Sequence, residues 1–323
     1  EIRRYIQLPY ALDGGTFHLG GTLYHFTPVL TDKVISPGLN SVFVRLLRDK
    51  VNFDRFQYSA KVDGKDYTSQ VIWSLIYRNV KQNNKVPPTT RAVPTTVHYL
   101  LGKYGLKGMF EKFAGFSPIA GENEINEATY PKESWVICGS CEQKPSRSYL
   151  ETFYEPSKIK LAIPRDKWDT FTESLVIGFF YIVDHFPQEI RVQYLNNPAD
   201  WKILLGAIYF SGHHGRAKLL SDIEEHYKSL DEYLDPIVIA KLTEIGYNIQ
   251  DFYELLGLVI RNFNDWVINA NENTISVYGK TLEVLYYVLF DITSAIFRTN
   301  FKLNKQAARS KASGGKELTE KEI

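Results

Sequence analysis

The stretch DTFTESLVIGFFYIVDHF, residues 169–186, decides the fold. As a helix it is apolar on almost every side, and it stops before Pro187, which cannot continue helical hydrogen bonding. A helix that is apolar all round is stable only when other elements cover it. We therefore expect this helix in the middle of a layer of helices.

Further helices are predicted on its C-terminal side. Asn197 provides a cap and Pro198 occupies the first helical position, where proline is tolerated. Apolar residues recur at helical spacing in the segments that follow. The strongest apolar stripe comprises Leu255, Leu256, Val259, Ile260, Phe263 and Trp266. The predicted helices are residues 196–210, 216–234, 235–248, 249–271 and 281–298, with a short strand at 274–278.

The N-terminal half is different in character, because Gly and Pro interrupt it at short intervals and predict short strands and loops. The clearest element is a hairpin near residues 56–70. Asp63 and Gly64 suit its two-residue turn, and alternating apolar residues precede them. Apolar spacing predicts a helix over 69–80, and three prolines predict an extended connector over 81–96.

These patterns predict an α+β fold, in which an irregular, strand-containing N-terminal part packs on an all-helical C-terminal part. We expect these parts at residues 1–165 and 166–298, forming one domain or two. Residues 299–323 are expected to be a basic, flexible tail that leads to a further helix, because LTEKEI (318–323) carries a capping box and a hydrophobic staple. That signal favours a segment of a longer chain.

The composition weakens several functional classes. With 38 basic and 37 acidic residues among 323, the net charge shows no preference for nucleic acid, anionic membranes or acidic substrates. No apolar stretch reaches the about 20 residues that a membrane span needs, so we expect a soluble protein. The aromatic content of 14%, with 21 Tyr, suits large shared surfaces as well as a core.

Cys138 and Cys141 form a Cys-x-x-Cys pair, which can be half of a zinc site or a redox dithiol. Zinc would need further ligands, and His213 and His214 would have to supply them from the helical half. A redox role is disfavoured because no helix with an apolar face follows the pair. Two free thiols and no cofactor are the favoured interpretation, and a structural zinc is the alternative.

The segment SGHHGR, residues 211–216, presents His213, His214 and Arg216 between two helices. Imidazoles beside a guanidinium can bind a phosphate or transfer a proton. No nucleophile or carboxylate stands at a fixed offset from them. A polar loop in which Arg216 pairs locally is therefore favoured over a catalytic site.

The basic residues near the C-terminal end are the feature that could contact nucleic acid. Between Asp291 and Glu317 the chain has cations and no acids. Each cation could meet a phosphate, and binding would then weaken steeply with salt. The candidate contacts are Lys302, Lys305, Arg309 and Lys311. A solubilising linker is the competing interpretation, because no known nucleic-acid-binding motif accompanies them.

The sequence contains no convincing catalytic set, so an enzyme is not favoured. The first hypothesis is a structural or assembly subunit within a large assembly, such as a viral or phage particle. Its partners would be other protein subunits or other parts of the same longer chain. The alternative is a nucleic-acid-binding or nucleic-acid-processing module, such as an accessory of a polymerase or replication complex. The expected location is the cytoplasm or the inside of a particle.

Overall fold

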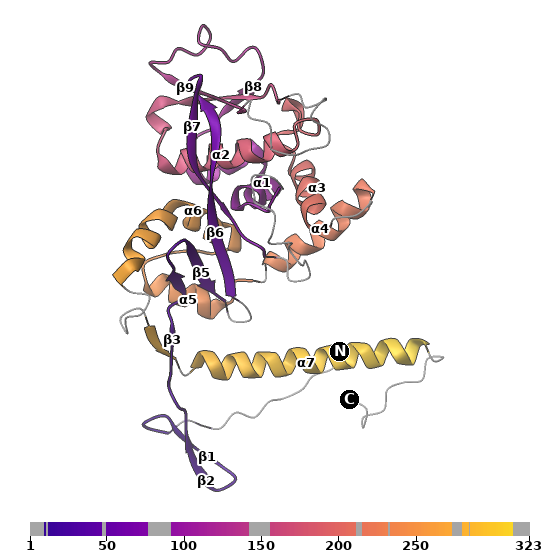
Figure 1. The fold of residues 1–323 in the computed structure, drawn as a ribbon. Coiled ribbons are helices and arrows are strands. Elements are labelled where there is room, and N and C mark those ends of the chain that lie inside the picture. Colours follow the sequence, from indigo (N-terminus) through magenta and orange to yellow (C-terminus); the bar gives the residue numbers. More distant parts are fainter. Residues whose placement is uncertain are drawn as a thin grey trace. The chain divides into compact units, whose positions relative to one another are not determined.

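The structure is a computed structural model that describes residues 10, 12–46, 50–76, 92–141, 156–210, 215–231, 233–272, 280–283 and 285–312. The chain divides into a smaller unit, Glu1–Lys33 with Ile275–Ile323, and a larger unit, Val34–Thr274 (Figure 1). An antiparallel sheet region comes first along the chain and a mostly helical region follows it, so the predicted α+β class is confirmed.

The larger unit contains a seven-stranded antiparallel sheet. Its strands are β4 (Ile35–Pro37), β5 (Ser41–Arg45), β6 (Lys50–Val62), β7 (Lys65–Trp73), β8 (Ile119–Gly121), β9 (Trp135–Gly139) and β10 (Lys160–Pro164). The order is β4-β5-β6-β9-β10-β8, and β7 also pairs with β6. The long strand β6 therefore connects the two ends of the sheet.

The predicted hairpin is confirmed as β6 and β7. Val62 pairs with Lys65, and Asp63 and Gly64 have φ angles of 49° and 78°. These positive angles are those of the tight two-residue turn that an Asp-Gly pair favours.

The helix predicted over 69–80 is wrong for its first part, because β7 continues to Trp73. Gln70, Val71 and Ile72 are buried in succession, so this end of the strand is covered on both faces. A strand buried on both faces reads as a continuous apolar run, which periodicity cannot separate from a helix. Residues 77–91, with most of the predicted connector, lie outside the described residues.

Helix α1 (Thr96–Ala114) follows and was not predicted. Thr95 caps it, because its side chain accepts a hydrogen bond from the backbone N–H of His98 at 3.1 Å. Gly105, with a φ of 69°, kinks the helix where it meets the backbone of Asn196. A Cβ at Gly105 would lie 2.6 Å from the Asn196 carbonyl oxygen, so glycine permits this close approach.

The five helices that follow match their predictions closely. They are α2 (Thr170–His185), α3 (Pro198–Tyr209), α4 (Arg216–Asp231), α5 (Pro236–Glu244) and α6 (Phe252–Ile268). Asn197 caps α3 as predicted, by accepting from the N–H of Ala199. Along α6 the predicted stripe is buried except for Trp266, which is half-buried.

Helix α2 lies at the centre of the larger unit. It packs against β6 and β7 on one side and against α1 and α6 on the others (Figure 1). Most of its residues are buried, including both Phe179 and Phe180. Other elements cover this helix as expected, but the predicted position in the middle of a layer of helices is only partly right, because the sheet covers one of its sides.

The smaller unit consists of two-stranded ladders and one long helix. The strands β1 (Thr16–Leu19) and β2 (Thr22–His25) form one ladder, and β3 (Val29–Asp32) pairs with β11 (Lys280–Glu283). Helix α7 (Leu285–Ala312) follows β11. None of the helices in the described ranges combines the length and the hydropathy that crossing a lipid bilayer requires.

The predicted bounds of the last helix are wrong at both ends. Strand β11 occupies the position where Thr281 was expected to begin the helix, and α7 continues past Arg298 to Ala312. Residues 299–312 have few apolar side chains but are rich in Lys, Ala, Arg and Gln. These residue types have high helix propensity, so an exposed helix forms without an apolar stripe. The predicted strand at 274–278 lies outside the described residues.

Candidate functional sites

Helix α7 carries a row of cations on one face. Arg298, Lys302, Lys305 and Arg309 follow one another at spacings of four, three and four residues. This spacing places all four on one side of a helix over about 16 Å. Of these side chains, Arg298, Lys302 and Lys305 are exposed. We call these four residues the cationic stripe; Lys311, the remaining predicted contact, falls on the other side of the helix by register.

Two aromatic residues adjoin the cationic stripe on α7. Phe297 and Phe301 are spaced by four residues, and their side chains are 42% and 70% exposed. Large apolar side chains exposed in a row are unusual on a surface that meets only water. Cations beside exposed aromatic rings can bind both the phosphates and the bases of a nucleic acid strand.

The second predicted site is only partly described. Arg216 begins α4, and its guanidinium forms an ion pair with the carboxylate of Asp200 on α3. The two residues line a pocket of about 280 Å³ beside Trp201. His213 and His214 lie outside the described residues. A shared role for the two histidines and Arg216 therefore stays a prediction.

Cys138 lies near the end of β9, and Cys141 lies two residues beyond the strand. Both are buried and neither forms a disulfide. The Sγ of Cys141 lies 3.8 Å from Oδ1 of Asp66, and burial raises the pKa of the Cys138 thiol well above its usual value. A buried neutral thiol is a weak metal ligand. No cluster of three or more metal-ligating side chains occurs in the described ranges, and the zinc alternative stays a prediction that metal analysis would check.

Asp184, near the C-terminal end of α2, is a buried carboxyl that the sequence analysis did not single out. Burial raises its pKa to about 6, and hydrogen bonds only partly offset this effect. One of these bonds comes from the Tyr58 hydroxyl at 2.8 Å, which joins α2 to β6. The neighbouring His185 hydrogen-bonds through Nδ1 to the Tyr181 carbonyl, and burial lowers its pKa. The sequence could not reveal this site, because an acidic residue near the end of an apolar helix can be either buried or exposed to solvent.

Comparison with known proteins decides between the functional hypotheses. A family model described as "Non-virion RNA polymerase subunit" matches residues 1–320. None of the curated proteins matches the chain. A non-virion polymerase is by its name a transcription enzyme outside the particle, so the hypothesis of a structural protein or virion component is wrong.

The alternative, an accessory of a polymerase, agrees with this match. Other polymerase subunits and nucleic acid are accordingly the partners of the protein. The match covers nearly the whole sequence, both the larger unit and the smaller one. The chain belongs to the family of non-virion RNA polymerase subunits.

Proposed function

We propose that this subunit holds a single strand of nucleic acid for the polymerase along helix α7. The observation that carries the proposal is the cationic stripe with Phe297 and Phe301 beside it. Proteins that bind single strands combine a cationic track for the backbone with aromatic rings on which bases stack. The proposal includes the predicted cytoplasmic location, because a polymerase acts where its template is.

The charge balance of α7 supports this role. The helix has no acid after Asp291, so no carboxylate of its own is available to the cations of the stripe at spacings of three or four residues. Arg298, Lys302 and Lys305 are exposed to solvent, and a phosphate can reach them without any change in the helix.

Fluorescence anisotropy of a labelled single-stranded oligonucleotide, measured with the full chain over a range of salt concentrations, tests the proposal. Affinity should fall steeply with salt. In the variant with Lys302→Ala and Lys305→Ala, the slope of log K against log salt should become shallower by about 1.4, because each phosphate contact contributes about 0.7. Lys311→Ala is the matched control, since it removes the same charge from the other side of the same helix.

Phe301→Ala separates stacking from charge in the same assay. We expect a loss of about 1–3 kcal/mol in binding free energy with an unchanged salt slope. The proposal would be contradicted if the affinity did not depend on the salt concentration. It would also be contradicted if Lys311→Ala and the double variant lost the same amount of affinity. Arg216→Ala, measured alongside, checks the predicted second site.

A further inference from the structure

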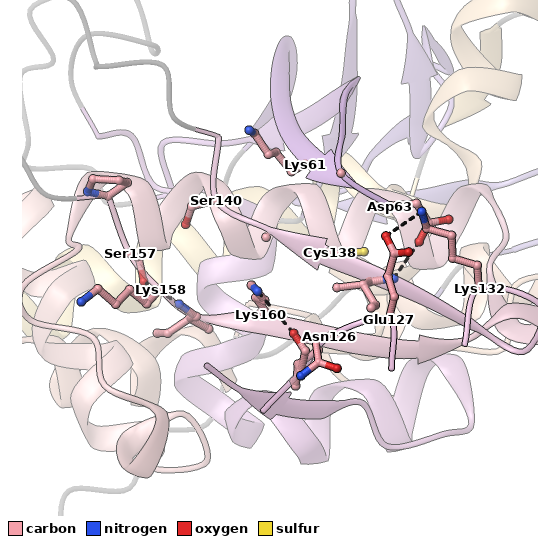
Figure 2. A pocket seen from close by; sticks show the side chains of 16 residues that line it. Lys61, Asp63, Asn126, Glu127, Lys132, Cys138, Ser140, Ser157, Lys158 and Lys160 are labelled. Atoms are coloured by element: carbon pink, nitrogen blue, oxygen red, sulfur yellow. Dashed lines mark hydrogen bonds and ion pairs between the residues drawn. The ribbon is translucent and has the colours of Figure 1, made fainter. Parts of the chain in front are cut away.

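A pocket of about 680 Å³ opens on the outer face of the sheet in the larger unit (Figure 2). The turn between β6 and β7, the end of β9, the start of β10 and residues 125–127 line it. Four lysines and two acids are among the lining residues, which leaves a net positive charge. Its volume lies within the range of about 300–1,000 Å³ that small-molecule sites occupy.

The register of the sheet builds the centre of this pocket. Lys61 of β6 pairs with Gly139 of β9, and Gly139 pairs on its other side with Lys160 of β10. Residues that pair directly across strands face the same side of a sheet. The two lysines therefore stand about 10 Å apart, two strand spacings, with no side chain between them. A Cβ at Gly139 would meet only Lys160 Cγ, at 3.8 Å.

The acids of the pocket are neutralised by their own partners. Asp63 accepts from the Ile137 N–H at 3.0 Å through one oxygen and from Arg165 at 2.7 Å through the other. Glu127 forms an ion pair with Lys132 at 2.6 Å, at the far end of the pocket from Lys158 (Figure 2). A ligand that binds Lys160 would therefore not have to displace either carboxylate from it.

The lysines at the opposite side keep their charge available. Lys160 donates to the Ile125 carbonyl at 3.3 Å, a neutral acceptor, and Lys158 is exposed. A third carboxylate, Glu124, lies over Gly121 at the far side of Lys160. Hydrogen bonds from backbone N–H groups lower its pKa.

Apolar groups complete the pocket. Ile125, Ile137, Ile159 and Pro156 line it together with the hydroxyl-bearing Ser140 and Ser157. An apolar lining beside cations suits a ligand that carries an apolar, flat body and a phosphate group. A nucleotide has both parts, whereas an inorganic anion would use only the lysines.

We propose that this pocket binds a nucleotide, with its phosphate between Lys61 and Lys160 and its base against Ile137 and Pro156. The nucleotide is either a free ribonucleoside triphosphate or a phosphorylated end of a nucleic acid strand, which share this chemistry. The proposal does not depend on α7, because the pocket belongs to the larger unit and the cationic stripe to the smaller one.

Equilibrium binding of radiolabelled ATP and of a 5′-phosphorylated RNA hexamer to the full chain tests the proposal. Gly139→Val should weaken binding at least tenfold, because it fills the gap between the lysines without removing a charge and valine suits a strand. Lys160→Ala should weaken it similarly, while Lys228→Ala, an exposed lysine on α4, should not. The thermal unfolding temperature of each variant shows whether it is folded, and Lys61→Ala replaces any variant that is not.

The two probes distinguish the sources of the phosphate. Binding of ATP identifies a free nucleotide, and binding of the hexamer but not of ATP identifies a strand end. The same measurements are repeated in a protein that also carries Lys302→Ala and Lys305→Ala, which removes charges from the cationic stripe. The outcome for the pocket is then separate from the outcome for the α7 proposal. If neither probe binds, if Gly139→Val binds like the wild type, or if a poly-glutamate peptide competes as well as ATP, the proposal is overturned.

Discussion

Asp184 gives the larger unit a dependence on pH that a single substitution can isolate. Its pKa is raised to about 6 in the folded protein, above the usual carboxyl value of 3.8. The folded state therefore binds the proton more tightly than the unfolded state, and stability falls as pH rises from about 4 to about 6. A shift of this size corresponds to about 3 kcal/mol.

Asp184→Asn should remove this loss, because the amide cannot ionise and can still accept from the Tyr58 hydroxyl. The unfolding free energy of the variant minus that of the wild type should increase by about 3 kcal/mol as the pH rises from about 4 to about 6. Above pH 6 this difference should stay constant. Urea unfolding at several pH values measures the difference. Burial lowers the pKa of His98 and of His226 to about 4, but both are present in the two proteins and their effects cancel. A difference that stays constant with pH would contradict this account.

Among the elements, α1 depends most on a glycine. At Gly105 an alanine would have to adopt a φ of 69° and place its Cβ 2.6 Å from the Asn196 carbonyl oxygen. The backbone of Gly105, with φ 69° and ψ 177°, lies in a region that is essentially restricted to glycine, so a residue with a Cβ there costs about 1–3 kcal/mol, and the contact adds to this cost. We expect Gly105→Ala to reduce the unfolding free energy by at least about 2 kcal/mol in chemical denaturation.

Gly108→Ala is the matched control on the same helix. Its φ is not positive, and the nearest atom to the added Cβ is the Cβ of Tyr104 at 3.3 Å. Alanine has a higher helix propensity than glycine by about 1 kcal/mol, so this variant should be neutral or more stable. Equal losses in both variants would show that α1 needs glycine for another reason than the Asn196 contact.

The elements that the sequence predicted well are those whose signals are local. Helices α2 to α6 have an apolar stripe or a cap residue, such as Asn197, within their own segments. The end of strand β7 was predicted as helix because burial on both faces conceals its alternation, and α1 was missed because Gly105 serves a contact with a distant segment. The lysine pocket could not be predicted, because Lys61, Gly139 and Lys160 meet only through the register of three strands. The basic residues of the cationic stripe were predicted as a run of charges. Their arrangement on one face could not be predicted, because the predicted helix ended at Arg298 and α7 continues to Ala312.

At the scale of the whole molecule, the two units differ in how they are stabilised. Among the residues whose side-chain burial the structure describes, the buried apolar side chains belong to the larger unit. Most of the large apolar side chains that are exposed belong to the smaller one. They are Tyr10, Leu12, Leu19, Leu23, Tyr24, Val29, Leu30, Leu282, Ile296, Phe297 and Phe301. A two-stranded ladder by itself is at best marginally stable in water, so we expect the smaller unit to need a partner surface.

We expect the exposed apolar side chains of this unit, other than Phe297 and Phe301 of the proposed nucleic-acid site, to contact other polymerase subunits, because the family is one of polymerase subunits. Hydrogen exchange, followed on the isolated chain and on the purified polymerase, measures the effect. Backbone amides of α7 and of the β1–β2 ladder should exchange rapidly in the isolated chain and become protected in the polymerase, since docking buries apolar side chains that otherwise face water. Amides of α2 provide the internal control, because they are buried within the larger unit and should be protected in both samples. Equal protection of α7 in the two samples would mean that the smaller unit is stable by itself, and its exposed apolar side chains would then need another explanation.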